Sequence, residues 1–117
     1  MKRELLVQNP RPDGYHLMLE LYGCDMEKIN SHRFLHRAVK NAVKNVGLTN
    51  LGSRYHRFQP QGVTGFTLLA QSHISLHTWP EYGYAAVDIF TCRTAVDPKI
   101  AAEVLIEGLG CRNPNLT

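Results

Sequence analysis

One stretch decides how the chain folds, namely Ser72-His73-Ile74-Ser75-Leu76-His77-Thr78-Trp79-Pro80-Glu81-Tyr82-Gly83-Tyr84-Ala85-Ala86-Val87-Asp88-Ile89-Phe90-Thr91-Cys92. Its first part, residues 73–78, alternates apolar with polar side chains, which is typical of a half-buried strand. Its last part, residues 84–92, is nearly all apolar or small, as expected for a central strand. The stretch therefore predicts two strands of a sheet.

Further strands are predicted on the N-terminal side of this stretch. Residues 15–22 alternate, with three leucines on one face. Residues 51–58 and 64–70 also have strand-like composition, and a break at Pro60-Gln61-Gly62 separates them. The sheet thus receives strands from both halves of the chain.

Two helices complete the predicted fold. Apolar residues at helical spacing run from Phe34 to Val46, with Asn30 or Ser31 as the cap and Gly47 at the end. A second helix begins at Asp97-Pro98. This order predicts an α+β two-layer sandwich, a mainly antiparallel sheet with both helices on one face. The other face stays open, so we expect a second copy to cover it in a homodimer.

The composition indicates one globular domain spanning residues 1–117. The chain is 44% hydrophobic and 20% charged. Neither a secretory leader nor a run long enough to span a membrane is visible, so we expect a cytoplasmic protein. Three cysteines, at 24, 92 and 111, form no C-x-x-C pair, which argues against a disulfide framework and a zinc cluster. Cys24 and Cys111 are interpreted as small buried apolar residues.

The charge of the chain is unevenly distributed. The net charge is +3, and no Asp or Glu occurs between Glu27 and Glu81, a stretch that contains seven Lys and Arg residues. A polyanion-binding module is one interpretation. A solvated basic face is the favoured one, and nucleic acid is not expected as a partner, because no stacking aromatics alternate with these charges.

Ser72, His77 and Cys92 place a hydroxyl, a base and a thiol within about twenty positions. Three accounts of this group are open. Cys92 and His77 could form a hydrolase pair. His73 and His77 could bind a metal, although residues four apart on a strand are ~13 Å apart, too far to share one ion, so no metal site is expected. The third account is backbone self-processing at Ser72.

The stretch from Ser72 to Cys92 closely resembles the signature of the small bacterial and archaeal S-adenosylmethionine decarboxylases. The upstream pattern H-R-F-x-P-x-G-V-T-G, residues 56–65, and the segment from His16 to Asp25 also match. The similarity covers most of residues 15–109. It implies the fold of that family.

The resemblance also implies autocatalytic serinolysis between Gln71 and Ser72. The Ser72 hydroxyl attacks the Gln71 carbonyl carbon, and the chain splits into residues 1–71 and 72–117, with Ser72 converted to a pyruvoyl cofactor. His77 matches the family's processing base. Thr64 takes the place of a family serine that assists the acyl shift.

In turnover, the resemblance implies a Schiff base between the pyruvoyl group and S-adenosylmethionine, loss of carbon dioxide, and an aminopropyl donor for spermidine synthesis. Cys92 matches the proton donor. Phe58 matches the residue that stacks on the adenine, and Glu81 matches the carboxylate that binds the ribose. Without the motif, Phe58, His77 and Cys92 would each be interpreted as a structural residue.

The sequence departs from the family pattern at several positions. Gln71 replaces a glutamate, Thr64 a serine and Arg93 a glycine. These changes leave open a same-family decarboxylase of arginine or ornithine, and an unprocessed, non-catalytic homologue. Ser72 and His77 would face opposite ways on a regular strand, so a turn or bulge is expected at 71–72.

Overall fold

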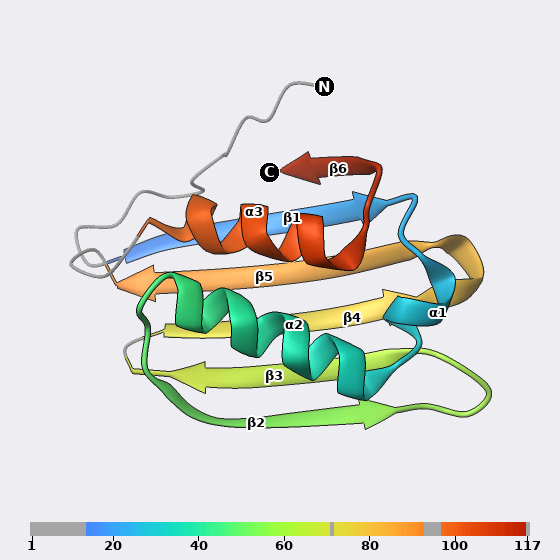
Figure 1. Ribbon diagram of the computed structural model, residues 1–117, viewed down its shortest axis with the longest axis horizontal. Coiled ribbons are helices and arrows are strands. Elements are labelled where there is room, and N and C mark those ends of the chain that lie inside the picture. Colours follow the sequence, from blue (N-terminus) through green and yellow to red (C-terminus); the bar gives the residue numbers. More distant parts are fainter. Residues whose placement is uncertain (1–13, 71, 93–96, 117) are drawn as a thin grey trace.

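The computed structural model describes residues 14–70, 72–92 and 97–116. Their core is a six-stranded sheet with strand order β2-β3-β4-β5-β1-β6, in which every neighbouring pair is antiparallel (Figure 1). The strands are β1 Gly14–Tyr22, β2 Asn50–Arg57, β3 Val63–Leu69, β4 Ser72–Trp79, β5 Tyr84–Cys92 and β6 Asn113–Leu116. The predicted antiparallel sheet is confirmed.

The helices begin where the sequence provides caps. In α2, His32–Asn45, the Ser31 hydroxyl accepts a hydrogen bond from Phe34 N at 3.1 Å. In α3, Pro98–Leu109, the Asp97 carboxylate accepts one from Lys99 N at 2.9 Å. Both expected helices are therefore present, and α3 starts at the predicted residues.

Both long helices lie across the same face of the sheet, and together they form the second layer of the sandwich (Figure 1). The core between the layers is built from the apolar stripes of the helices and the inward residues of the strands, among them Leu17, Leu35, Ile74, Ile89 and Leu105. Burial of such side chains is the main stabilising contribution, at about 25 cal/mol per Å² of apolar surface. The opposite side of the sheet, called the open face below, carries no helix.

Three short elements were not predicted. A single helical turn, α1 Met26–Ile29, is capped by the Asp25 carboxylate, which accepts hydrogen bonds from Glu27 N and Lys28 N. After α3, the chain returns as β6 and pairs with β1 at the edge of the sheet. The 3₁₀ turn η1, Pro80–Tyr82, connects β4 to β5.

The interpretation of Cys24 and Cys111 as unpaired apolar residues is wrong, because the two form a disulfide. The bond joins the end of β1 to the segment between α3 and β6, which lies beside it, with Arg112 N donating to Gly23 O at 3.3 Å. Cys24 N also donates to Gly83 O, at 2.9 Å.

Within the described ranges, no helix combines the length and the apolar character that crossing a membrane requires.

Candidate active site

Thr64 and His77 form a hydrogen-bonded pair on the open face. They are direct partners in the β3–β4 ladder, and Thr64 Oγ1 lies 3.1 Å from His77 Nδ1. Strand alternation puts both side chains on the side away from the helices. This contact fixes the orientation of the imidazole ring, so the structure brings two predicted site residues together.

Phe58 and Glu81 complete this group. Together with Thr64 and His77 they line a pocket of about 220 Å³, whose floor and walls also include Gln61, Gly62, Val63, Thr78 and Trp79. Phe58 follows β2 and is 47% exposed, with its ring edge-on to His56 at 4.6 Å. Glu81 is exposed on η1. A half-exposed aromatic ring beside a carboxylate suits a ligand that has both a planar and a hydroxylated part.

Two glycines shape the chain around this pocket, Gly62 in its wall and Gly65 on the helix side of β3. Gly62 has φ +102°, and its N–H donates to Asn30 Oδ1 at 2.9 Å, which folds the β2–β3 connection back towards α1. A Cβ on Gly65 would lie 2.1 Å from the ring of Tyr55, so only glycine permits this ring to pack across the strand. The V-T-G sequence around Thr64 thus has a structural cause.

Ser72 lies elsewhere. It opens β4, where it pairs with Leu69 on one side and Thr91 on the other, and its side chain is turned towards the helices with only 7% of the residue exposed. Its hydroxyl has no hydrogen-bond partner. Pairing is regular from Ser72 onward, so the turn or bulge expected at 71–72 does not include Ser72. Gln71 lies outside the described residues, as does Arg93.

Ser72 and His77 therefore do not meet within one chain. They point to opposite faces, and their positions five residues apart on β4 place them about 16 Å from one another. Cys92 is half-buried on the open face, at the same end of the sheet as Ser72. Its distance from the strand position opposite His77, which is Ala86, is about 20 Å along β5. The alternative of a Cys92–His77 hydrolase pair within one chain is excluded by this separation.

The predicted residues thus form two groups at opposite ends of the central strands. Phe58, Thr64, His77 and Glu81 make up the pocket group, and Ser72 and Cys92 make up the strand-end group. The pocket group contains the predicted base, His77. The strand-end group contains the hydroxyl of Ser72 and the thiol of Cys92.

A histidine–carboxylate group at the centre of the open face was missed as a unit. Asp88 accepts from both His16 Nε2 and His73 Nε2, the second at 3.2 Å. The His73 ring also stacks between Phe66 and Phe90, at centroid distances of 6.3 and 6.0 Å. The pairing register of β1, β4 and β5 brings these three residues together. The sequence shows only that each of them occupies a polar position of an alternating strand.

Tyr22 and Tyr84 share one acceptor further along the open face. Both hydroxyls donate to Glu20 Oε1, each at 3.2 Å, and the two rings lie 5.0 Å apart. Burial, followed by the adjacent Glu20 charge, raises the pKa of Tyr84 above its usual value. The hydroxyl of Tyr84 therefore remains a hydrogen-bond donor throughout the neutral range.

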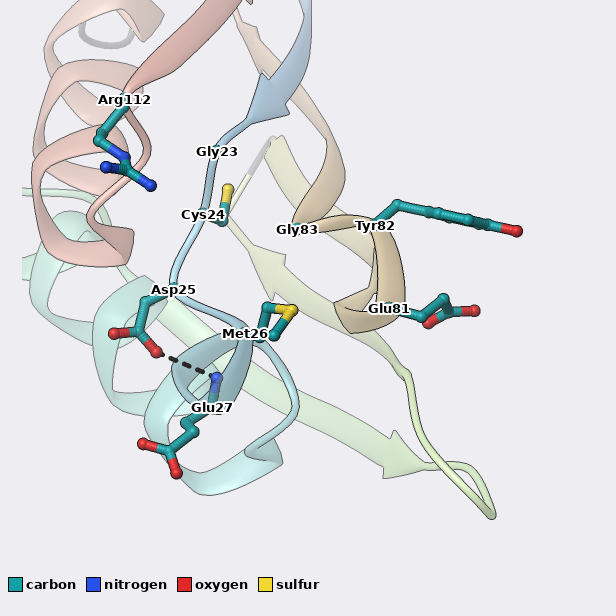
Figure 2. Close-up of a pocket in the computed structure, with 9 residues that line it drawn as sticks. All are labelled: Gly23, Cys24, Asp25, Met26, Glu27, Glu81, Tyr82, Gly83 and Arg112. Atoms are coloured by element: carbon teal, nitrogen blue, oxygen red, sulfur yellow. Dashed lines mark hydrogen bonds between the residues drawn. The ribbon is translucent and has the colours of Figure 1, made fainter.

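A larger cavity of about 560 Å³ adjoins the pocket group, with which it shares only Glu81. It surrounds the end of β1 and η1, and Figure 2 shows Glu81 and Tyr82 projecting away from Asp25 and Glu27 rather than towards them. Asp25 is already engaged in capping α1. The diverging side chains give this cavity no convergent binding geometry. Among the residues that the structure describes, no group of three potential metal ligands occurs.

Four of the seven basic residues between Glu27 and Glu81 lie on α2, apart from both groups. Arg33, Arg37, Lys40 and Lys44 are exposed on α2, on the helix layer rather than the open face. They carry no stacking aromatic partners of the kind that single-stranded nucleic acid requires.

Comparisons with known proteins agree with this geometry. A family model described as S-adenosylmethionine decarboxylase matches residues 15–117. S-adenosylmethionine decarboxylase proenzymes of Prochlorococcus marinus (strain MIT 9313) and Synechococcus sp. (strain WH7803) are 53% and 51% identical, each over 86% of this chain and over 80% and 78% of their own lengths. The crystal structure of the adenosylmethionine decarboxylase from Aquifex aeolicus VF5 superimposes with a TM-score of 0.82 at 39% identity, covering 92% of this chain and 89% of that one. The chain belongs to the S-adenosylmethionine decarboxylase family.

Proposed function

We propose that this chain is a carboxy-lyase that decarboxylates S-adenosylmethionine after cutting itself between Gln71 and Ser72. The observation that carries the proposal is the Ser72 hydroxyl, which is buried and unpartnered at the start of β4. A buried hydroxyl without a partner destabilises the fold by about 1–3 kcal/mol, so its presence needs a functional reason. Nucleophilic attack on the preceding carbonyl provides one.

The cleavage begins as an acyl shift. Ser72 Oγ bonds to the Gln71 carbonyl carbon, and its proton passes to Ser72 N as the peptide bond breaks. The resulting ester loses the Ser72 α-proton and its Cβ–Oγ bond breaks, which splits the chain and leaves a dehydroalanine at residue 72. Water then hydrolyses this residue to a pyruvoyl group, and its amino nitrogen leaves as ammonia. We assign the base to His77 in the tautomer that donates Nδ1–H to Thr64 Oγ1, because in this tautomer Nε2 carries the lone pair that accepts a proton. The products are residues 1–71 and residues 72–117, which we place together in one decarboxylase domain.

Turnover requires a ketone or aldehyde carbonyl, which none of the twenty side chains supplies. A pyruvoyl group at residue 72 supplies a carbonyl that takes up the electron pair as carbon dioxide leaves. Cys92, at the same end of the sheet, is the donor that returns a proton to the product. Phe58 stacks on the adenine and Glu81 accepts hydrogen bonds from the ribose hydroxyls, since both line the same pocket.

A second copy of the chain is needed to bring these roles together. The pocket group and Cys92 lie at opposite ends of the open face, on which Phe66, Trp79 and Phe90 are only partly buried. Ser72 begins β4 at the same end as Cys92, with its side chain turned towards the helices. A two-fold axis through this face places the pocket group of one chain opposite the strand-end group of the other, twice. We therefore propose a homodimer that contains two shared active sites.

The substrate is tested by carbon dioxide release. With S-adenosylmethionine, arginine and ornithine supplied separately to the purified chain, we expect release from S-adenosylmethionine alone. Mass spectrometry of the denatured, reduced chain should detect two fragments, of residues 1–71 and 72–117. Release from arginine or ornithine instead would show that the chain acts on another substrate. A chain that stays whole on long incubation would contradict the enzyme proposal altogether.

Phe58→Ala should weaken substrate binding without slowing the chemical step. Stacking of an aromatic side chain on a base is worth about 1–3 kcal/mol, so we expect KM to rise on the order of tenfold while kcat stays near the wild-type value. Phe58 is half-exposed, so the fold should tolerate the change. Phe58→Tyr, which keeps the ring, is the matched control; an unchanged KM in the alanine variant would rule out the stacking role.

The product of the proposed reaction is an aminopropyl donor, which fits a place in spermidine synthesis. We propose a cytoplasmic location on the sequence alone. Fractionation of cells that express a tagged chain tests it.

A further inference from the structure

Four buried polar side chains face the helix layer in the described part of the chain, and only two of them are satisfied. Thr67 Oγ1 contacts Tyr55 OH at 2.9 Å and Ser53 Oγ at 3.0 Å. Thr78 Oγ1 accepts from Val63 N at 2.9 Å and donates to Ile29 O at 2.7 Å. The hydroxyls of Ser72 and Thr91 have no partner, although the residues are only 7% and 0% exposed.

The two unsatisfied hydroxyls are neighbours. Ser72 and Thr91 are direct partners in the antiparallel β4–β5 ladder, and both side chains point to the same side of the sheet. Side chains that are directly opposite in such a ladder have Cβ atoms about 4.5–5.5 Å apart. Rotation about the Cα–Cβ bonds is therefore enough to bring the two oxygens within hydrogen-bonding distance.

We propose that Thr91 is a positioning residue for the self-cleavage, and that its hydroxyl accepts a hydrogen bond from Ser72 Oγ–H. This inference rests on the proposed function, since it assigns a task in the cleavage at Ser72. Thr91 and Ser72 both carry an unsatisfied polar atom in the resting fold, which is stable only because the surrounding core is well packed. Because both unsatisfied hydroxyls lie at one ladder position, we infer that Ser72 and Thr91 act in the same step.

The role follows from the geometry of the acyl shift. For Ser72 Oγ to attack the Gln71 carbonyl carbon, a lone pair must point to that carbon and the hydroxyl hydrogen must point elsewhere. Thr91 Oγ1 provides an acceptor on the adjacent strand. The Oγ–C bond forms, the C–N bond to residue 72 breaks, and the hydroxyl hydrogen ends on that nitrogen, which becomes a free amine. Thr91 gains and loses no proton overall.

The task of Thr91 ends when the chain is cut. When the ester breaks, Oγ of Ser72 leaves with the new carboxylate of residue 71, so no Ser72 oxygen remains for Thr91 to orient. The inference therefore predicts an effect on the rate of cleavage and none on the turnover of chains already cut.

Thr91→Val tests this directly, because valine keeps the branched shape and removes the hydroxyl. Cleavage is followed over time after cell-free synthesis, on reduced denaturing gels. We expect the valine chain to be cut about tenfold more slowly than wild type, as for the loss of one hydrogen bond in a rate-limiting step, and Thr91→Ser to be cut at nearly the wild-type rate. After complete cutting, kcat per cut chain should match the wild type.

Stability separates the positioning role from a purely structural one. In chains that also carry Ser72→Ala, and so stay whole, Thr91→Val should raise Tm because it removes an unsatisfied buried hydroxyl. A variant that is more stable and yet slower to cut cannot owe its slowness to a damaged fold. Thr67→Val is the matched control, since it removes a satisfied hydroxyl on the same side of the sheet; it should lower Tm and leave the cleavage rate unchanged.

The outcomes distinguish this inference from the proposed function. If the wild-type chain stays whole, both are wrong. If the wild-type and Thr91→Val chains are cut equally fast, or if Thr91→Ser is as slow as Thr91→Val, only the role of Thr91 is wrong. Should the valine chain fail to fold, Thr91→Ala, which also lacks the hydroxyl, carries the same expectation against Thr91→Ser.

Discussion

Replacement of Ser72 by alanine should leave the chain whole and without decarboxylase activity. The hydroxyl is both the nucleophile of the cleavage and the source of the catalytic carbonyl, so no second route to the active form exists. Loss of a catalytic nucleophile costs on the order of 10⁴-fold or more in rate, and here the loss should reach the limit of detection. Reduced denaturing gels and carbon dioxide release measure the two effects.

Ser75→Ala is the matched control for this experiment. Ser75 lies on the same strand, but its side chain is on the open face and is half-buried. We expect the Ser75 variant to be cut and to be active. A Ser72→Ala chain that is still cut at residue 71 would contradict the acyl-shift mechanism, whatever its activity.

Mixing two inactive variants should restore activity if the site is shared between chains. His77→Ala removes the base of the pocket group, and Cys92→Ala removes the thiol of the strand-end group. Each variant alone leaves every site of its dimer incomplete. In a mixed dimer one of the two sites receives His77 from one chain and Cys92 from the other, so coexpression should recover about a quarter of wild-type activity.

The control for this experiment pairs two variants from the same group. Ser72→Ala coexpressed with Cys92→Ala leaves no site complete, since both residues belong to the strand-end group, and we expect no recovery. Recovery in this control would show that Ser72 and Cys92 act from different chains, which contradicts the strand-end group. No recovery in the His77 and Cys92 pair, despite mixed dimers detected by differential tags, would show that the active site lies within a single chain.

The sequence predicted the layers of this fold well because local signals decide them. The alternation of residues 73–78 placed Ile74 and Leu76 in the core, and the Asp97-Pro98 pair marked the start of α3. The four-residue α1 depends on one capping carboxylate, and β6 contains a proline, so neither produced a periodic pattern. Such short elements are stabilised by neighbours distant in the sequence, which periodicity does not detect.

The site was predicted by residue but not by arrangement. Strand alternation already put Ser72 and His77 on opposite faces, and the expected bulge was an attempt to reunite them in one chain. The structure instead separates them along β4. The β4–β5 register places a second buried hydroxyl residue, Thr91, directly opposite Ser72. Register is a property of two strands together, so no single stretch of sequence contains it.

The Cys24–Cys111 bond changes how self-cleavage has to be observed. Cys24 lies before the Gln71–Ser72 bond and Cys111 after it, so the oxidised protein stays one covalent molecule when that bond is cut. Its mass then differs from that of the uncut chain only by the gain of one water and the loss of one ammonia. On a gel run without a thiol reductant, a fully matured preparation would look almost like an inert precursor, and the pieces would separate only once the sulfurs are released from one another.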